Sequence, residues 1–518
     1  MPPAASSTSA EVDASEPEAS GVDDSGPVRG GGRWKRTLLH VPGEVYVLTA
    51  LAALTRFVSL GNPKAIVFDE VYFREYALRY QEGTYYFDLH PPLGKLLLGA
   101  WAWITGTDAS AAGDDPAVML RVLPALAGTA LILAFYCLIR QLCGSRKVAT
   151  LGAGLLLLDG AILVESRLTT LDSVLLLLGV TGVTLALMAR ARRTPVPDDG
   201  GGGAVAGGGR VYWLLLAGSA LSAGAAASIK LTGLAPLGLV GVIWLISVLE
   251  DSRDLPRIWR PTLGQAALLV LVPVTVYVSS FAVHFALLPD SGPGDAFMSQ
   301  EFQATLEGNP LYSPDADMSF VAKFEDLNRA IHQYELALND STHPYQSSWT
   351  SWPITKRGVF TYVAPADDGK SSYIYVLGNP VVWWGTLLGA AVVVVGWSLR
   401  RELFRPWRWP LGLLAFAWAV DYLPFVLIER PMFLYHYFFA LMFSLAFVVI
   451  GLGVLTGWVR PRPASARAFS FESRPSAIGF WSVLGIALLA FLYFAPIYYG
   501  TPLTPEGLEN RMWLSSWR

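Results

Sequence analysis

The sequence predicts an all-α membrane protein that crosses the bilayer many times. Of its 518 residues, 53% are hydrophobic and only 15% are charged, and the mean hydropathy is +0.42. Soluble domains carry about 25% charged residues, so this composition is typical of a polytopic membrane protein. The net charge of −3 gives no indication that the chain binds nucleic acid.

Eleven apolar runs are long enough to cross about 30 Å of hydrocarbon. They lie near residues 41–60, 118–139, 147–165, 171–190, 211–229, 231–249, 263–284, 379–398, 409–428, 433–457 and 478–499. A further run, residues 93–104, is shorter, and counting it as a span would reverse the side of every later loop. If it is left out, clusters of Lys and Arg fall on one side, beginning at Arg33, Arg140, Arg190, Arg253, Arg400 and Arg460. An excess of basic residues marks the cytoplasmic side, so we expect residues 93–104 to form a helix lying in the membrane interface.

This topology places the N-terminus in the cytoplasm and the C-terminus outside. Residues 1–36 lack an apolar core and are expected to form a disordered cytoplasmic tail. Residues 37–284 form an N-terminal transmembrane module that includes a first outer loop, residues 61–117. Residues 285–378 form a large extracytoplasmic loop, and residues 379–518 form a C-terminal transmembrane module with an outer tail. We expect function at the two outer loops, because they are the large connections on that face.

Ionisable residues are concentrated in the first outer loop. Asp69 and Glu70 are adjacent just beyond the first span, and Arg56, His90 and Lys95 lie close to them in the sequence. Carboxylates beside cations at a membrane surface suit an anionic lipid substrate. Charged groups at membrane depth are costly and commonly functional, although residues at span ends also snorkel harmlessly to water.

Other candidate substrate-binding residues lie along both outer loops and at the outer ends of spans. They are Asp88, His90, Arg167, Arg430, His436, Trp349 and Trp352. Asp88 and His90 precede Pro91 and Pro92, so capping of a helix is the alternative to substrate contact. Arg167 lies near Asp172, with which it could form an exposed ion pair of little value. The tryptophans suit either packing at the membrane surface or binding of an acceptor.

An ordered set of motifs carries a family resemblance. The motifs are Phe68-Asp69-Glu70, His90-Pro91-Pro92-Leu93, Met119-Leu120-Arg121, Ser166-Arg167, Leu171-Asp172-Ser173, Ser228-Ile229-Lys230, Leu377-Gly378-Asn379-Pro380 and Tyr435-His436-Tyr437. Together they resemble the protein O-mannosyltransferase family, over nearly the whole chain. The resemblance implies a GT-C glycosyltransferase fold and a lipid donor, polyprenyl-phosphate mannose. Eukaryotic members carry a β-trefoil MIR domain in the long outer loop, and residues 285–378 are too few to hold one, so the match is to the bacterial branch.

Mannosyl transfer from a lipid phosphate to Ser or Thr needs a base near the acceptor hydroxyl, but it hardly needs an acid. The phosphate already leaves as a stable anion, so a single carboxylate suffices where glycosidases use two. By the resemblance, Asp69 is the general base. Glu70 is expected to be an orienting or hydrogen-bonding partner, because adjacent residues usually point in different directions. Direct attack by the acceptor predicts inversion at the anomeric carbon, since no separate nucleophile is evident.

The donor phosphate requires fixed positive charge, which Arg supplies in a forked geometry. Arg56 and Arg121 match the phosphate-binding arginines of the family, and Lys230 is a further candidate at the outer end of its span. No metal site stands out in the sequence. We leave open a divalent cation held by Glu70 and the donor phosphate.

Two other classes of protein stay as alternatives. A GT-C enzyme acting on a lipid or polysaccharide acceptor would share the Asp-Glu loop and the topology. A transporter of lipid-linked substrates would place ionisable groups near mid-membrane and show paired repeats, which we do not find. For a protein mannosyltransferase, the resemblance implies the lipid-linked donor, unfolded secretory proteins and the Sec translocon as partners. It also implies a multi-pass protein of the cell (plasma) membrane with its site on the extracytoplasmic face.

Overall fold

The computed structural model describes residues 41–107, 118–193, 209–251, 255–459, 469, 471 and 473–518. Residues Glu44–Arg518 form one compact unit. Of the other unit, Met1–Gly43, only residues 41–43 are described. The predicted cytoplasmic tail, residues 1–36, therefore lies outside the described residues.

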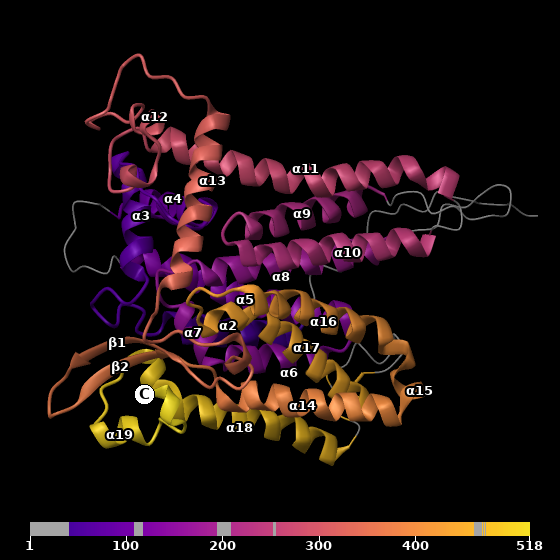
Figure 1. The fold of residues 1–518 in the computed structure, drawn as a ribbon. Helices are drawn as coiled ribbons and strands as arrows, with labels where there is room; N and C mark the ends of the chain where they lie inside the picture. Colours follow the sequence, from indigo (N-terminus) through magenta and orange to yellow (C-terminus); the bar gives the residue numbers. More distant parts are fainter. Residues whose placement is uncertain are drawn as a thin grey trace, which may run out of the picture. The chain divides into compact units, whose positions relative to one another are not determined.

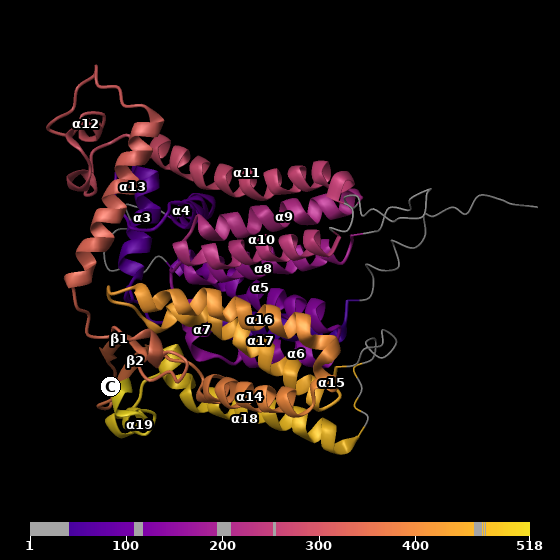
Figure 2. The same ribbon diagram turned by 45° about the vertical axis from the view of Figure 1, so that its right-hand side comes forward.

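Long helices run side by side and form the membrane bundle (Figures 1 and 2). They are α2 (Gly43–Phe57), α5 (Val118–Cys143), α6 (Arg146–Leu157), α7 (Gly160–Glu165), α8 (Asp172–Arg190), α9 (Arg210–Ala227), α10 (Leu234–Asp251), α11 (Leu255–Leu287), α14 (Pro380–Leu399), α16 (Arg408–Tyr422), α17 (Phe438–Leu455) and α18 (Arg474–Tyr499). Each of the predicted spans coincides with one of these helices or with a consecutive pair. The predicted all-α class is confirmed.

Among the described residues, 8 helical stretches are long and apolar enough to cross a membrane on their own. The other expected spans correspond to α2, to α6 with α7, and to α9, which are shorter or less apolar. Helix α17 is the most enclosed of the spans, with 78% of its apolar window buried inside the protein. The count of eleven spans and their sidedness stay predictions.

Both predicted outer loops and the C-terminal tail gather at one end of the bundle (Figure 1). Their elements are α3 (Glu70–Glu82), α4 (Leu93–Thr105), α12 (Gln300–Gln303), α13 (Phe320–Ala337), the antiparallel strands β1 (Val359–Pro365) and β2 (Ser371–Val376), and α19 (Pro505–Glu509). Helices α3 and α13 run across the direction of the long helices in both views. Helix α4 has 13 residues, too few to span a bilayer, as expected for the interfacial helix at residues 93–104.

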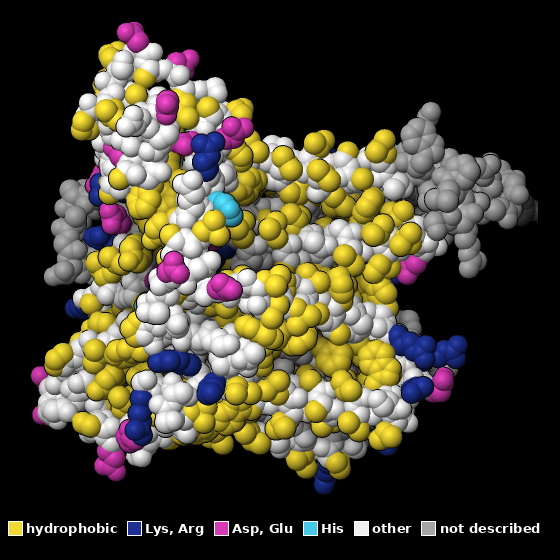
Figure 3. All heavy atoms as spheres, in the orientation of Figure 1, with side chains coloured by type: hydrophobic (Ala, Val, Ile, Leu, Met, Phe, Trp, Pro, Cys, Tyr) yellow, Lys and Arg dark blue, Asp and Glu magenta, His cyan; other side chains and the backbone are white. Residues whose placement is uncertain are grey.

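The surface of the bundle has the polarity of a membrane protein. Figure 3 shows hydrophobic side chains along the long helices and charged side chains towards their two ends. At the end opposite the outer loops, Arg400, Arg401 and Arg405 are exposed around the short helix α15 (Arg401–Phe404). This end is the one that the distribution of basic residues predicts to be cytoplasmic.

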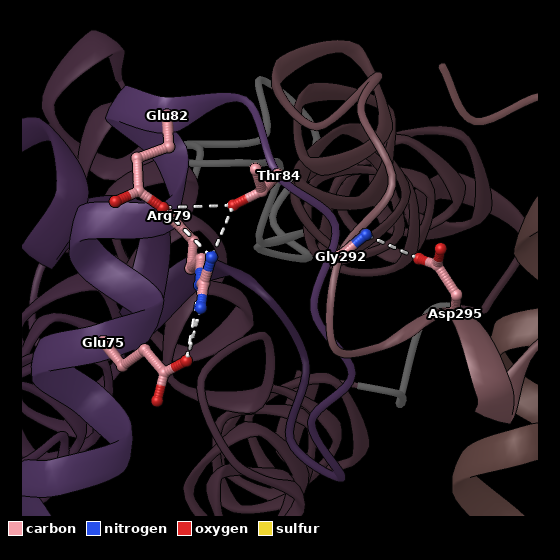
Figure 4. Close-up of polar contacts among 6 residues, drawn as sticks. All are labelled: Glu75, Arg79, Glu82, Thr84, Gly292 and Asp295. Carbon is pink, nitrogen blue, oxygen red and sulfur yellow. Dashed lines mark hydrogen bonds and ion pairs between the residues drawn. The ribbon is translucent and has the colours of Figure 1, made fainter. Parts of the chain in front are cut away.

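Backbone hydrogen bonds join the two outer loops directly after α3. Tyr85 donates its N–H to the carbonyl of Asp290 over 2.8 Å, and the N–H of Asp290 donates to the carbonyl of Gly83 over 3.0 Å. Figure 4 shows both sides of this junction. The Asp295 carboxylate accepts the N–H of Gly292 over 2.9 Å, and on the α3 side the Arg79 guanidinium is held by Glu75, Glu82 and Thr84. The first and second outer loops are therefore fixed to each other, and side chains from both can line one site.

Candidate active site

A cavity of about 610 Å³ lies at the end of the bundle where the outer loops gather. Its walls come from α3, residues 86–90, the first turns of α8, residues 230–232 before α10, the last turn of α13, residues 338–343 after it, and residues 430–439 before and at the start of α17. One wall is apolar and belongs to the membrane bundle, with Leu175, Leu176, Leu231 and Phe439. The rest of the lining is largely aromatic and charged. A cavity of this kind suits a ligand that has a hydrocarbon part and a polar part.

Asp69 lines this cavity with an unpartnered carboxylate. It is the N-cap of α3, yet its side chain makes no capping hydrogen bond, and no ion pair or hydrogen bond to its carboxylate occurs among the described residues. Burial raises the pKa of Asp69 to about 6; Lys230 opposes this rise, while Asp172 and Asp88 add to it. A carboxylate of this pKa is ionised at neutral pH and is a stronger base than an ordinary Asp, as general-base catalysis requires.

Glu70 points away from the cavity and is fully buried. Its carboxylate accepts two hydrogen bonds from Arg121, over 2.7 Å from Nε and 2.6 Å from Nη2. It also accepts the backbone N–H groups of Val67 over 3.0 Å and Thr169 over 2.8 Å. These contacts fit the predicted orienting role of Glu70. They do not favour the divalent ion that we left open at this residue, because the carboxylate oxygens are already occupied by donors.

Arg121 does not line the cavity, although it was predicted to bind the donor phosphate. It is fully buried, and besides Glu70 its guanidinium donates to the carbonyls of Leu60, Pro63 and Ala65 over 2.9 to 3.3 Å. Carbonyls beyond the end of a helix have no partner within that helix and need one elsewhere. Arg121 supplies such partners to the segment after α2. In this arrangement it has no donor directed at the cavity.

Arg167 likewise supplies hydrogen-bond donors to carbonyls at the end of α2. Its guanidinium donates to the carbonyls of Arg56, Val58 and Ser59 over 2.7 to 2.9 Å and packs on the ring of Tyr499. It neither lines the cavity nor pairs with Asp172, so the predicted ion pair is wrong. The partner of Asp172 is Lys230.

Arg56 is also placed away from the cavity. Its side chain is fully buried, and Nη1 donates to the hydroxyl of Thr55 over 2.8 Å. The sequence argument for Arg56 and Arg121 as phosphate ligands was their match to the family's phosphate-binding arginines at the outer ends of spans. Neither side chain lines the cavity, although Nε and Nη2 of Arg56 have no hydrogen-bond partner among the described residues.

Two cations do line the cavity, and each faces a carboxylate. Lys230 Nζ lies 2.7 Å from Asp172 Oδ2, and Arg430 Nη2 lies 3.9 Å from Glu335 Oε1. Lys230 was predicted as a phosphate ligand and Arg430 as a substrate contact. Both are therefore placed where an anionic group of a ligand could reach them.

Asp88, His90 and His436 also line the cavity, as predicted for substrate contacts. The N-cap of α4 is Pro92, so neither Asp88 nor His90 has the alternative capping role. Asp88 forms an ion pair with the buried Lys95. Burial lowers the pKa of His90 well below its ordinary value, with Lys230 and Lys95 adding to the effect, so its imidazole is neutral and can both donate and accept a hydrogen bond.

Trp349 and Trp352 do not line the cavity. Trp352 is fully buried, donates from Nε1 to the Ser347 hydroxyl over 2.9 Å, and stacks on His436 with ring centroids 5.9 Å apart. Trp349 packs against Tyr422. The structure therefore fits the packing role for both residues, and Trp352 packs against the cavity residue His436.

Several residues that line the cavity were not predicted from the sequence. Tyr72 and Tyr76 follow Asp69 at helical spacing and lie on the same face of α3, a signal that the sequence contained. The others are Tyr334, Glu335, His343 and Tyr435, from α13, the chain after it and the segment before α17. No local pattern indicates which face of α13 meets the cavity, because that depends on how the outer loops pack together.

Two family models match the chain. The model described as dolichyl-phosphate-mannose-protein mannosyltransferase matches residues 46–289, and the one described as the C-terminal four TMM region of protein-O-mannosyltransferase matches residues 320–517. The two matches leave out only the N-terminal region and part of the second outer loop.

Similar curated proteins carry the same kind of name. A polyprenol-phosphate-mannose–protein mannosyltransferase of Mycolicibacterium smegmatis is 26% identical over 91% of this chain and 92% of its own length. Dolichyl-phosphate-mannose–protein mannosyltransferase 4 of Candida albicans is 30% identical over 60% of this chain. The chain spans only 42% of the length of that fungal relative, and 29% of protein O-mannosyltransferase 1 of Drosophila pseudoobscura pseudoobscura.

Among solved structures, the chain is similar to the Saccharomyces cerevisiae protein O-mannosyltransferase Pmt1-Pmt2 complex bound to the sugar donor. The TM-score is 0.77 at 19% identity, over 93% of both chains. A second similar structure is apo ArnT from Cupriavidus metallidurans, with a TM-score of 0.50 at 15% identity over 88% of this chain and 76% of that one. These likenesses establish the fold and confirm the GT-C architecture predicted from the motifs.

Proposed function

The chain belongs to the protein O-mannosyltransferase family, and from this premise we propose that it transfers mannose from polyprenyl-phosphate mannose to Ser or Thr hydroxyls of proteins. The observation that carries the proposal is the unpartnered Asp69 carboxylate in a cavity that also has two cations and an apolar wall. A base, a site for a phosphate and a surface for a lipid chain are the parts that this reaction requires.

The donor occupies the cavity with its phosphate at Lys230 and Arg430. Both cations line the cavity, and an anionic phosphate can replace or share their contacts with Asp172 and Glu335. The first isoprene units lie along the apolar wall formed by α8, Leu231 before α10, and α17. This proposal gives the phosphate-binding role to two residues with access to the cavity, since neither Arg56 nor Arg121 lines it.

Asp69 acts as the general base. As the acceptor hydroxyl oxygen attacks the anomeric carbon, its proton passes to the Asp69 carboxylate, and the bond from that carbon to the phosphate oxygen breaks. The lipid phosphate leaves with the bonding electron pair, so no acid is needed at the leaving group. Attack from the side opposite the phosphate inverts the anomeric centre. The neutral imidazole of His90 and the tyrosine hydroxyls of α3 are placed to hold the sugar hydroxyls.

The reaction takes place on the extracytoplasmic face of the cell membrane. The cavity lies at the bundle end that carries the two large loops, and the exposed arginines around α15 lie at the other end. An acceptor at this face is a segment of a secreted or membrane protein that is still unfolded, as it is when it leaves the Sec translocon. A flexible segment can bring a hydroxyl to a recessed base, which a folded surface cannot do.

The test is transfer from radiolabelled polyprenyl-phosphate mannose by the purified full chain. The acceptors are a Thr-containing peptide, the same peptide with Thr replaced by Val, and a membrane lipid extract. We expect label in the Thr peptide alone, in the anomeric configuration opposite to that of the donor. Label in the lipid extract with none in the peptide would instead identify an enzyme with a lipid or polysaccharide acceptor, and retained configuration would exclude direct attack.

A further inference from the structure

We propose that Glu335 of α13 makes the site selective for acceptor segments with a positively charged residue near the Ser or Thr that receives mannose. The inference rests on the proposed function and adds a determinant of acceptor choice to it. It starts from the carboxylates that line the cavity, which are Asp69, Glu75, Asp88, Asp172 and Glu335.

All but one of these carboxylates either have a proposed catalytic role or contact a cation at hydrogen-bonding distance. Asp69 is the proposed base, and Asp88 and Asp172 form ion pairs with Lys95 and Lys230. Glu75 accepts two hydrogen bonds from Arg79, over 2.9 and 3.3 Å. The Glu335 carboxylate differs, since its nearest cation, Arg430, lies 3.9 Å away, which is beyond hydrogen-bonding distance.

Binding of the donor leaves the negative charge of Glu335 without a nearby cation from the described part of the chain. The donor phosphate carries a negative charge and is attracted to Arg430, which lines the same cavity as His90 and His436. When Arg430 turns to the phosphate, Glu335 loses its only nearby cation among the described residues. A carboxylate with its side chain 28% exposed then faces the cavity unpaired.

The acceptor must enter past this carboxylate. The wall made by α8, residues 230–232 before α10, and α17 belongs to the membrane bundle and takes the lipid, whereas α3 and α13 cross the bundle end on the outer side (Figures 1 and 2). Tyr334 from the same helix and Tyr72 from α3 line the same cavity, and 36% and 56% of their surfaces are exposed. Aromatic faces and a carboxylate both attract a Lys or Arg side chain.

The experiment compares three peptides that are identical except for the residues flanking the acceptor Thr, which are Lys, Gln or Glu. Transfer is measured as kcat/KM with wild type, Glu335→Gln and the matched control Glu325→Gln. Glu325 lies on the same helix and is exposed, but it is not part of the cavity. In wild type we expect kcat/KM for the Lys peptide to be about two- to five-fold higher than for the Glu peptide. This is the size of effect expected for a partly exposed ion pair.

Glu335→Gln should remove this preference, so that kcat/KM becomes similar for the three peptides, and Glu325→Gln should keep it. Raising the salt concentration should reduce the preference in wild type, because the pair is partly exposed to solvent. Equal rates for the three peptides in wild type, or an unchanged preference in Glu335→Gln, would overturn the inference. A uniform loss on all peptides in Glu335→Gln would do so as well, since it would indicate that the contact with Arg430 only holds α13 in place. No transfer to any peptide would overturn the proposed function itself.

Discussion

Asp69 and Glu70 are adjacent in the sequence but have opposite environments. Asp69 faces the cavity with no partner for its carboxylate among the described residues, whereas Glu70 is buried beneath the loop and accepts four hydrogen bonds. Phe68, directly before them, has a positive φ of 47°, a backbone conformation that residues other than glycine rarely adopt. Strained backbone of this kind persists where surrounding contacts hold it, and the buried contacts of Glu70 provide them.

The pH dependence of transfer tests the environment of Asp69. With a pKa of about 6, Asp69 gains its proton and loses base function as the pH falls below 6, so kcat/KM should fall about tenfold per pH unit there and be level above pH 7. An ordinary Asp, with a pKa near 3.9, would sustain the rate down to about pH 4. The control is donor binding over the same range, which should change little because the phosphodiester-like donor does not titrate there. A rate that is level down to pH 5 would contradict the assignment.

Among elements, the segment from the end of α2 to the start of α3 is held by arginines from its neighbours. Arg167 lies before α8, and Arg121 lies in the first turn of α5. Both donate hydrogen bonds to carbonyls between residues 55 and 65, and Arg121 also donates to the Glu70 carboxylate. The backbone of the loop that ends at Asp69 is therefore held in place by these hydrogen bonds. We infer from these contacts that Arg121 positions Asp69 through Glu70 and the loop.

Arg121→Gln and Lys230→Gln should separate positioning from phosphate binding. Breaking the buried pair of Arg121 with Glu70 leaves a buried charge uncompensated, so we expect the free energy of unfolding to fall by about 3–5 kcal/mol and transfer to be lost. Lys230→Gln should mainly weaken binding of the donor, because Lys230 lines the cavity. Thermal unfolding in detergent and titration with the donor measure the two effects. If Arg121→Gln were as stable as wild type and only its donor affinity fell, Arg121 would be a phosphate ligand after all.

For the molecule as a whole, the sequence was sufficient for the fold class and for part of the site. Long apolar runs locate the helices because the bilayer imposes their length, and the motif at Asp69 marks one wall of the cavity. Arg56 and Arg121 do not line the cavity, and the sequence could not show this, because a position at the end of a span does not tell which side of the bundle a side chain faces. Their contact with the donor phosphate stays a prediction. Glu335 and Tyr435 were not identified as site residues, since they meet Asp69 only through packing between segments hundreds of residues apart.

The sidedness of the bundle can be tested in intact cells with single cysteines. The native Cys137 and Cys143 are replaced by Ser, and either Asp367→Cys, in the turn between β1 and β2, or Arg401→Cys, at α15, is introduced; both positions are exposed. A membrane-impermeant maleimide should label the cysteine at position 367 in intact cells and the one at 401 only after permeabilisation. The opposite pattern would place the cavity on the cytoplasmic face.

The central claim is that Asp69 removes the proton from the acceptor hydroxyl. Asp69→Asn keeps the size of the side chain and removes the base, and Asp367→Asn, in the exposed turn, serves as the control. In single-turnover transfer from polyprenyl-phosphate mannose to the Thr peptide, with donor binding and thermal unfolding shown to be intact, we expect Asp69→Asn to be slower by at least about a hundredfold. The control should retain the wild-type rate. A folded, donor-binding Asp69→Asn variant that transfers mannose at the wild-type rate would contradict the account.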